Sequence, residues 1–247
     1  MSLKISIITI CYNDISGLSD TCDSLLKQQF TNFEWVVVDG SSKDGTLDYL
    51  KKNTVVTKFV SEPDQGIYDA MNKGTAMATG EYVIYMNAGD QFTSEAVLDR
   101  CSKYLKSQSL IFCGANFEYG NGSYRYRAPR HFSSIWHSVP ANHQAIIFKR
   151  ECLGESPYDK SYSICGDYEL LAQLYIKGYK ADLLDLALVV FKVGGVSTFA
   201  LQALSKEALR VQREVLHLNI GMRYVSWARR QVAMLINLLI LTLNPIK

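Results

Sequence analysis

The sequence predicts an α/β fold with a mostly parallel central sheet flanked by helices. Short apolar, β-branched runs alternate with helical patterns through roughly the first 90 residues, which is typical of parallel strands joined by helical crossovers. The chain of 247 residues is 48% hydrophobic, which suits a globular domain and excludes a disordered or low-complexity protein. Its 26 Lys and Arg against 24 Asp and Glu give a net charge of +2, so composition gives no reason to expect a nucleic-acid partner.

The elements expected in the first half follow from apolar runs that end in turn residues. Each strand is a run of Val, Ile or aromatic residues, and each helix carries apolar residues at helical spacing. Gly80 follows the third expected helix, and glycine commonly ends a helix. The expected strands are Ile5–Cys11, Glu34–Asp39, Val55–Val60 and Tyr82–Met86, and the expected helices are Ser16–Gln29, Thr46–Lys52 and Tyr68–Met77.

The second half is less regular, and its last part is helical only. Residues Gly114–Arg130 are rich in Tyr, Gly and Arg and predict a hairpin around Gly120-Asn121-Gly122. Helical patterns without strand signals run from Leu201 to near Leu243, which predicts a helical C-terminal extension. The remaining expected elements are strands at Leu110–Phe112, Ala145–Phe148 and Leu186–Phe191 and a helix at Asp167–Gly178.

Cysteine spacing and the N-terminal sequence favour an intracellular protein. The six cysteines are irregularly spaced and contain no C-x-x-C pair, which argues for reduced, mostly buried thiols rather than a zinc or redox motif. The apolar run Ile5–Ile10 is too short for a signal peptide and begins a strand. We therefore expect a cytoplasmic protein, with the inner face of the membrane as a further location.

Acidic residues follow all four strands expected in the first half. Ligands bind at the carboxyl ends of the strands in an open parallel sheet, so these positions predict a binding site. One such aspartate is often only a turn residue, but several at one edge suit a hydroxyl-rich or nucleoside ligand, or a metal that bridges to phosphate. The sequence lacks a dinucleotide-binding glycine motif, a P-loop and a G-x-S-x-G elbow. The acidic residues are Asp14, Asp39, Glu62, Asp64 and Asp90.

Four segments of the first half resemble the opening of family 2 glycosyltransferases, which have the GT-A fold. Their order and spacing are specific, and the resemblance is greatest to the capsule- and colanic-acid-type branch. It is strong over residues 3–95, patchy over 140–200, and carries nothing specific beyond that. The segments are Ile5–Asn13, Val37–Thr46, Ser61–Gly74 and Ala78–Asp90.

The resemblance implies a nucleotide-diphosphate sugar donor and an inverting, metal-assisted transfer to a glycan or lipid-linked acceptor in surface polysaccharide biosynthesis. In the Rossmann-like nucleotide-binding half, Ile10 and Tyr12 would line the nucleobase and ribose, and Asp39 would accept a hydrogen bond from the base. Asp64 and Lys73 would lie near the nucleotide. The nucleotide-sugar-binding residues that it implies are Ile10, Tyr12, Asp39, Ser41, Asp64, Lys73, Asn87 and Gly89.

The segment Asn87-Ala88-Gly89-Asp90 resembles the Asp-x-Asp-Asp metal motif of the family but departs from it. Asn87 and Gly89 replace two of the acids, and only Asp90, at the position that usually meets the metal, remains. One carboxylate together with the donor diphosphate and water can hold Mg²⁺ or Mn²⁺. We therefore expect weak, substrate-dependent metal binding at Asp90.

Three later segments resemble catalytic or substrate-contacting parts of the family. Cys165–Leu171 matches the base segment, which implies that Asp167 takes the proton of the acceptor hydroxyl; the alternative is that Asp167 only caps a helix. His143 and Gln144 match a position near the acceptor or the diphosphate, with a structural histidine as an equal alternative. Gly194–Ser197 match a loop that often closes over the donor phosphates, or form a plain turn.

The chain is expected to divide into a GT-A domain over 1–200 and a helical extension over 201–247. Residues 1–95 would form the nucleotide-sugar-binding half, and 96–200 the acceptor and catalytic half. The extension is basic and then apolar at Val232–Leu243, which is shorter than the roughly 20 residues of a membrane span. Such a segment suits peripheral membrane contact through 223–247, or packing on the domain or in a homodimer.

A glycosyltransferase is thus the expected function, and two alternatives are weighed against it. A nucleotidyltransferase would carry a Gly-rich, basic loop after the first strand, and Cys11–Ser16 lacks one. A non-catalytic nucleotide-sugar-binding or membrane-docked partner protein is favoured by the depleted metal motif and disfavoured by the presence of Asp167.

Overall fold

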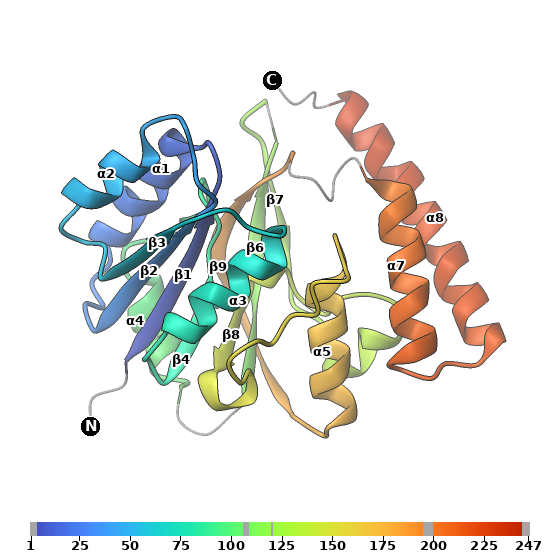
Figure 1. Ribbon diagram of the computed structural model, residues 1–247. Helices are drawn as coiled ribbons and strands as arrows, with labels where there is room; N and C mark the ends of the chain where they lie inside the picture. Colours follow the sequence, from blue (N-terminus) through green and yellow to red (C-terminus); the bar gives the residue numbers. More distant parts are fainter. Residues whose placement is uncertain (1–3, 106–108, 120, 195–199, 244–247) are drawn as a thin grey trace.

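The computed structural model describes residues 4–105, 109–119, 121–194 and 200–243. Its centre is one nine-stranded mixed sheet, and helices cover both faces of that sheet (Figure 1). The predicted α/β class is therefore confirmed.

The first half is a parallel four-stranded unit, as the sequence predicts. Its strands are β1 (Ile5–Cys11), β2 (Phe33–Asp39), β3 (Lys58–Ser61) and β4 (Tyr82–Tyr85), joined by the helices α1 (Ile15–Leu26), α2 (Thr46–Lys52) and α3 (Ile67–Met77). The strands lie in the order β3-β2-β1-β4, and each neighbouring pair is parallel. All four therefore end at the same edge of the sheet, where the residues that follow them meet.

The second half adds strands that run in both directions. β8 is antiparallel to both β4 and β6 and so joins the two halves, whereas β9 is parallel to β6. The sheet continues as β8-β6-β9-β5, with β7 paired to β6. The elements are β5 (Gln91–Phe92), α4 (Val97–Ser102), β6 (Leu110–Glu118), β7 (Tyr124–Arg127), η1 (Phe132–Trp136), η2 (His143–Ala145), β8 (Ile146–Lys149), η3 (Arg150–Cys152), α5 (Gly166–Ile176) and β9 (Ala181–Lys192), where η marks a 3-10 turn.

Two strands are longer than expected because they pair with each other. β6 and β9 are hydrogen-bonded along nearly their whole lengths, with an irregular register around Cys113 and Gly114. β9 begins at Ala181, since this pairing outweighs Asp182 and Asp185, which weaken the apolar pattern of its first residues. β5 and α4 are not among the expected elements, because both are too short to show a period.

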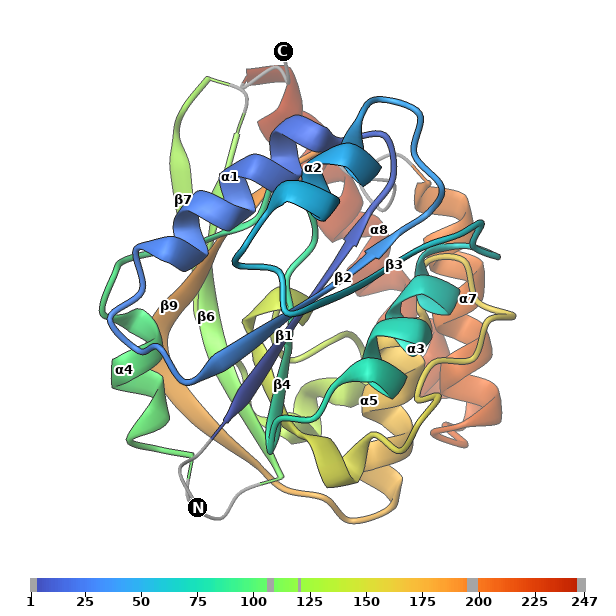
Figure 2. The same ribbon diagram turned by 60° about the vertical axis from the view of Figure 1, so that its left-hand side comes forward.

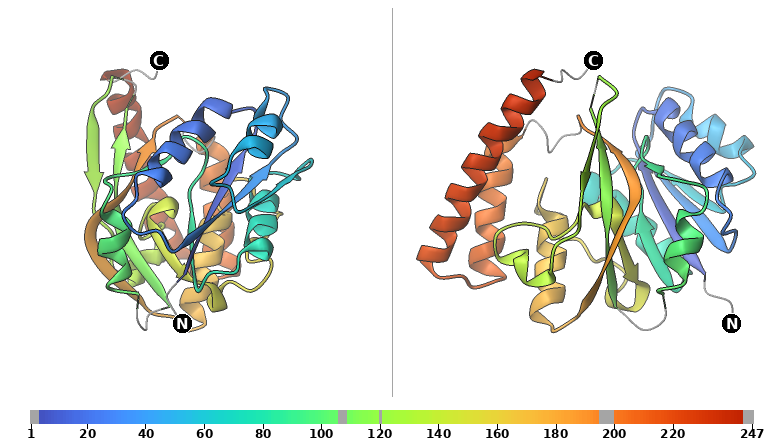
Figure 3. Two further views of the ribbon diagram at one scale, coloured as in Figure 1. Left: turned by 90° about the vertical axis from the view of Figure 1, so that its left-hand side faces the viewer. Right: turned by 180° about the vertical axis from the view of Figure 1, so that it is seen from behind.

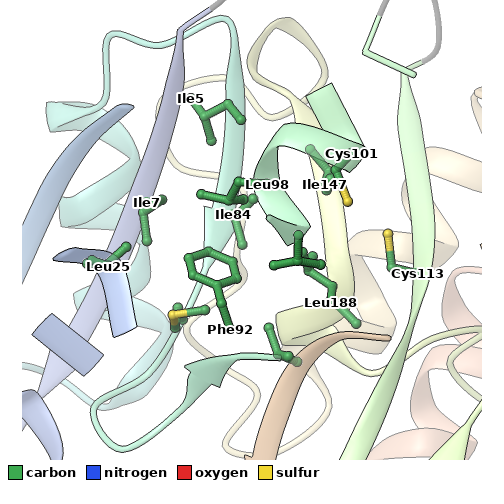
Figure 4. Packing of buried hydrophobic residues seen from close by; sticks show 14 of the residues in the cluster. Ile5, Ile7, Leu25, Ile84, Phe92, Leu98, Cys101, Cys113, Ile147 and Leu188 are labelled. Carbon is green, nitrogen blue, oxygen red and sulfur yellow. The ribbon is translucent and has the colours of Figure 1, made fainter. Parts of the chain in front are cut away.

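Each face of the sheet has its own hydrophobic core, because side chains alternate along a strand. Ile5 and Ile7 of β1 belong to the core under α1 and α4, whereas Ile8 belongs to the core on the opposite face, under α3 and α5 (Figure 2). In the first core Leu25 and Phe92 pack among strand residues (Figure 4). Five of the six cysteines are buried and Cys152 is half-buried, in agreement with the expectation of mostly buried thiols.

The C-terminal extension forms two helices, α7 (Leu201–Glu214) and α8 (Ile220–Leu243), which lie side by side at the end of the molecule away from α1 and α2 (Figure 3). Gln212 is buried and joins them to the sheet domain. Its Nε2 donates to the Ser226 hydroxyl at 2.6 Å and to the Trp136 carbonyl at 3.1 Å. Within the described residues, no helix has both the length and the apolar character of a membrane span.

Candidate active site

A cleft of about 1810 Å³ lies at the carboxyl ends of β1 and β4 and extends to α5 and α8. Residues of both halves and of the C-terminal extension line it. The predicted site residues in its wall are Ile10, Tyr12, Asp64, Asn87, Gly89, Asp90, His143, Gln144 and Asp167. The cleft thus brings together most of the residues that the sequence singles out.

The end of β1 forms one part of the wall. Ile10 is half-buried, whereas Tyr12 is 69% exposed and offers an aromatic face to a planar ligand. Asp14 also lines the cleft and caps α1, because its Oδ1 accepts the N–H of Gly17 at 2.9 Å. Asp14 therefore both caps α1 and forms part of the cleft wall.

Asp39 and Ser41 lie behind the cleft wall, at the end of β2. Asp39 is buried and accepts hydrogen bonds from the Ser42 hydroxyl and, at 2.6 Å, from the Ser61 hydroxyl. Neither Asp39 nor Ser41 lines the cleft, but Gly40 between them does. The structure thus places Asp39 where it fixes the loop that borders the cleft.

Asp64 and Lys73 form an ion pair at 2.7 Å, in which Asp64 lines the cleft and Lys73 does not. Lys73 also lies 3.0 Å from a carboxylate oxygen of Glu62 and 3.4 Å from one of Asp69. Burial alone would lower the pKa of Lys73, but the hydrogen-bonded carboxylates of Asp64 and Glu62 raise it well above its usual value. Lys73 therefore holds Asp64 in position.

The turn after β4 places Asp90 in the cleft wall. Gly89 has a φ of +93°, a left-handed conformation that favours glycine, and its N–H donates to the Gly17 carbonyl at 2.9 Å. The Asp90 Oδ2 accepts the N–H of Asn87 at 3.2 Å. Asp90 is only 4% exposed, and burial raises the pKa of its carboxyl to about 7.

Asp90 has the chemistry of a metal ligand but does not form a complete metal site. Among the described residues Asp90 forms no ion pair, and Lys192, whose charge acts on it, pairs with Asp20 at 2.8 Å. A buried carboxylate without a paired cation suits Mg²⁺ or Mn²⁺. No group of three metal-binding side chains occurs in the described part of the chain, so donor phosphate oxygens and water would supply the other ligands.

Asp167 lies in the first turn of α5 and lines the cleft. The N-cap residue of α5 is Cys165, so Asp167 is not the cap, and its Oδ1 accepts the N–H of Tyr168 at 2.7 Å. Burial raises the pKa of Asp167 to about 6, although hydrogen bonds from Tyr168 and Tyr68 act in the other direction. A Cβ at Gly166 would lie 2.7 Å from the Tyr68 ring, so this glycine lets the ring pack beside Asp167.

Glu207 of α7 fixes the segment that leads into Asp167. Its carboxylate accepts the N–H groups of Ser163, Ile164 and Cys165, each at 2.9 Å. These are the residues directly before α5, so a residue of the C-terminal extension holds the segment that leads into this helix. The sequence gives no signal for this contact, because the partners are far apart along the chain.

His143 and Gln144 are buried at the inner end of the cleft wall, in η2. The His143 Nε2 lies 2.7 Å from the Tyr158 hydroxyl, and its ring stacks on Tyr85 with centroids 5.0 Å apart. Burial lowers the pKa of His143 to about 4, so the imidazole is neutral at physiological pH. This histidine is therefore part of a buried aromatic network and also borders the cleft.

Four arginines for which the sequence predicts no role in the site also line the cleft. The sequence shows only that Gly114–Arg130 and the C-terminal extension are rich in arginine, and this does not predict that these arginines lie at the cleft. Gly194 lines the cleft as well, whereas 195–197 of the predicted phosphate loop lie outside the described residues. The arginines are Arg127, Arg130, Arg229 and Arg230.

The fold and the site together define a class of protein. The parallel strands end in a polar, partly acidic edge of the kind that binds nucleotides, and a carboxylate with a raised pKa borders the same cleft from the second half. This is the arrangement of a transferase that acts on a nucleotide-bound donor. The chain belongs to glycosyl transferase family 2, whose family model matches residues 6–166, and it is a glycosyltransferase.

Curated relatives agree with this membership, two of them over about two thirds of the chain and a third over a shorter part. An uncharacterised glycosyltransferase of Mycobacterium tuberculosis is 31% identical over 177 residues, which are 68% of this chain and 67% of the relative. A PGL/p-HBAD biosynthesis glycosyltransferase of Mycobacterium bovis is 28% identical over 180 residues, 66% of each chain. The putative teichuronic acid biosynthesis glycosyltransferase TuaG of Bacillus subtilis is 29% identical over 112 residues, 44% of each chain.

Solved structures show that the fold is GT-A. TarS of S. aureus in complex with UDP-GlcNAc superposes with a TM-score of 0.67 at 17% identity, over 93% of this chain and 72% of that one. The mannosyltransferase PcManGT of Pyrobaculum calidifontis, in complex with GDP-Man and Mn²⁺, gives a TM-score of 0.63 at 20% identity, over 93% and 74%. At these identities the likeness concerns the fold alone.

Proposed function

We propose that this glycosyltransferase is an inverting enzyme that moves a sugar from a nucleotide-diphosphate sugar to a glycan or lipid-linked acceptor in surface polysaccharide biosynthesis. The observation that carries the proposal is the presence of Asp167 in the same cleft as the strand ends that form a nucleotide-binding edge. The names of the relatives in PGL/p-HBAD and teichuronic acid biosynthesis support the surface-glycan part of the proposal.

Asp167 would be the general base. It takes the proton of the acceptor hydroxyl as that oxygen attacks the anomeric carbon, and the bond between this carbon and the diphosphate oxygen breaks. With a pKa of about 6, Asp167 is mostly ionised at neutral pH and is a stronger base than an exposed aspartate. His143, whose pKa burial lowers to about 4, is poorly suited to this task; we propose that it and Gln144 shape the acceptor or diphosphate side.

The donor would bind along the strand ends of 1–95, with the acceptor bound by 96–200 and helped by the extension over 201–247. We propose that Asp39, Ser41 and Lys73 position residues of the cleft wall and do not contact the donor directly. Asp39 and Ser41 flank Gly40, and Lys73 forms an ion pair with Asp64. The residues proposed to contact the nucleotide sugar directly are Ile10, Tyr12, Asp64, Asn87 and Gly89.

Asp90 would hold Mg²⁺ or Mn²⁺ together with oxygens of the donor diphosphate. When bound, the metal neutralises charge on the leaving diphosphate. The buried carboxylate of Asp90 fits a divalent cation, and Mn²⁺ is the metal present in the PcManGT structure, which has the same fold. One protein ligand predicts that the metal binds well only when the nucleotide is present.

α8 supports peripheral contact with a membrane, where a lipid-linked acceptor would lie. Ile220, Tyr224, Trp227 and Leu235 follow one another at helical spacing on one face of α8. They are 77%, 67%, 39% and 63% exposed, respectively. Apolar and aromatic residues on one exposed helix face suit the boundary between water and lipid. A second copy of the chain packed on this face is the alternative.

Vesicle flotation tests the membrane contact. The chain should float with vesicles of phosphatidylglycerol and phosphatidylethanolamine, and the double variant Trp227→Ser/Leu235→Ser should lose at least about half of the floated fraction, because it removes exposed apolar area. Leu26→Ser is the matched control, since Leu26 is 60% exposed on the distant α1. Equal flotation of the unchanged chain and both variants contradicts the membrane contact. If the chain is a dimer in solution and only the double variant is monomeric, the face of α8 is instead a contact with a second copy of the chain.

A thermal-shift screen tests the proposed function. UDP-, GDP- and dTDP-sugars are compared with Mn²⁺ present, because a ligand at a hundred times its Kd stabilises the fold by about 2.7 kcal/mol. The donor that stabilises most should then be turned over with a glycan acceptor, giving a product of inverted anomeric configuration. Stabilisation without turnover by any acceptor favours the non-catalytic alternative, and no stabilisation by any nucleotide sugar contradicts the proposal.

A further inference from the structure

Four arginines form a positive surface in the cleft wall that the proposed mechanism does not use. They come from two places in the sequence: β7 with the segment after it, and the middle of α8. This arginine cluster consists of Arg127, Arg130, Arg229 and Arg230. Because the two segments meet only in the folded chain, the cluster is a product of how α8 packs.

Among the described residues, the two arginines of the first segment are held in place by an aromatic ring and by neutral oxygens and form no ion pair. The guanidinium carbon of Arg127 lies 4.0 Å from the centroid of the Phe117 ring, a cation–π contact, and both residues line the cleft. The Nη2 of Arg130 donates to the Ser138 hydroxyl at 2.7 Å. Both guanidinium groups keep further N–H donors for a ligand, since each has five.

The two arginines of α8 are oriented in a similar way. The guanidinium of Arg229 lies 5.9 Å from the Trp136 ring centroid. Arg230 is half-buried and donates to the Ser205 carbonyl and the Ser226 hydroxyl, both at 3.3 Å. Neutral oxygens and aromatic rings thus orient these side chains and leave their charge uncompensated.

The charge of the cluster is unbalanced. In the described parts of the chain no member forms an ion pair, whereas Arg210 of α7 pairs with Glu214 at 3.0 Å. Burial lowers the pKa of Arg130, and the positive charges of Arg229 and Arg127 lower it further. Like charges gathered in one part of a cleft repel one another, and a bound anion would relieve that repulsion.

His137 also lines the cleft, and its pKa shows the effect of the positive charge of the arginine cluster. Burial lowers the pKa of His137 to about 4, and the charges of Arg130, Arg229 and Arg230 contribute to that lowering. Several guanidinium groups that converge on one place are suited to phosphate oxygens, which they bind in pairs of parallel hydrogen bonds. A phosphoryl group would therefore fit this place.

The place of the cluster favours the acceptor over the donor. The proposed donor residues lie at the end of β1 or after β1, β3 and β4, whereas the cluster belongs to β7, the segment after it, and α8, which lies at the end of the molecule away from α1 and α2 (Figure 3). Gln212 links Trp136 and Ser226, which lie beside the cluster, to the hydroxyl of Tyr168, the residue after Asp167, at 3.4 Å. The arginines are thus coupled to the helix that carries the base.

We infer that the arginine cluster is a subsite for a phosphate or diphosphate group carried by the acceptor. This inference rests on the proposed function, since it presumes that the cleft holds an acceptor. The exposed apolar face of the same helix, α8, would lie toward the lipid while the arginines hold the phosphoryl group that joins lipid to sugar. The acceptor class is therefore a lipid-linked sugar phosphate or diphosphate.

The test measures binding of farnesyl diphosphate to the full chain by titration calorimetry, with and without the nucleoside diphosphate that stabilises it most. Arg229→Gln/Arg230→Gln should weaken farnesyl diphosphate binding at least about tenfold and leave nucleotide affinity unchanged within about twofold. Arg130→Gln, at an exposed residue, is a second variant in case the double variant is poorly folded. Arg213→Gln is the matched control, because Arg213 is exposed on α7 and outside the cleft.

The outcomes separate this inference from the proposed function. An acceptor subsite is supported if farnesyl diphosphate still binds when the protein is saturated with nucleotide, and if both cluster variants lose that binding. Displacement of farnesyl diphosphate by the nucleotide, or equal binding by all variants, overturns the inference even when the nucleotide binds normally. Equal affinity for inorganic pyrophosphate and farnesyl diphosphate overturns the lipid-linked class. Failure of every nucleotide to bind contradicts the proposed function instead.

Discussion

The two walls of the cleft carry opposite charge. The wall formed by the ends of β1, β3 and β4 contains Asp14, Asp64 and Asp90, whereas the wall formed by β7 and α8 contains the arginine cluster. A bound cation would stabilise the buried carboxylate of Asp90, and a bound anion would stabilise the guanidinium groups of the cluster. The two walls are therefore suited to different substrates. Under the two proposals, the donor diphosphate binds to a metal held by Asp90 in the acidic wall, and the phosphate of the acceptor binds to the arginine cluster in the basic wall.

The largest expected effect concerns Asp167, the proposed base, which lines the same cleft. Asp167→Asn should lower kcat by about 10²–10⁴-fold, because general base catalysis contributes this much, while nucleotide affinity stays within about twofold. Transfer assays and calorimetry of the same preparation measure the two quantities. Glu169→Gln is the control, a buried carboxylate in the same helix that does not line the cleft. Full turnover by Asp167→Asn would show that the base lies elsewhere.

A smaller effect is expected from pH, and it follows from the ionisation of Asp167. The base must be ionised to accept a proton, and burial raises its pKa to about 6. Therefore kcat/KM for the acceptor, measured with saturating donor and Mn²⁺ so that the proposed metal site at Asp90 is filled, should fall about tenfold for each pH unit below about 6 and stay level above it. The measurement is kcat/KM from pH 4.5 to 8.5, and a profile that is flat across pH 6 would exclude Asp167 as the titrating base.

The smallest effect is expected at Glu207, which links α7 to the base. Glu207→Gln removes the charge that receives three N–H groups, so unfolding free energy should fall by about 1–2 kcal/mol and kcat by several-fold. The charge of Glu207 also raises the pKa of Asp167, so the midpoint of the pH profile should move below about 6. Glu214→Gln, at an exposed site on α7, is the control. An unmoved midpoint would reduce Glu207 to a purely structural role.

The same two walls differ in how far the sequence predicts them. The strands and helices up to β4 are local patterns, and Asp64, Asn87 and Asp90 follow them directly, so their meeting at one edge could be predicted. The position of Asp167 came from a family resemblance to a short segment. Arg229 and Arg230 reach the cleft through contacts between distant segments, such as that of Gln212 with Trp136, which no local pattern encodes.

The carboxylate of Glu207 has a consequence for where this protein can be cut. A truncation at residue 200 would keep every strand of the sheet and would keep Asp167. It would also leave the N–H groups of Ser163, Ile164 and Cys165 without their acceptor and would delete Arg229 and Arg230. The domain boundary at residue 200 that the sequence predicts therefore separates Asp167 from the residue that fixes the segment before it, and we expect a stable, active fragment to need α7 and α8.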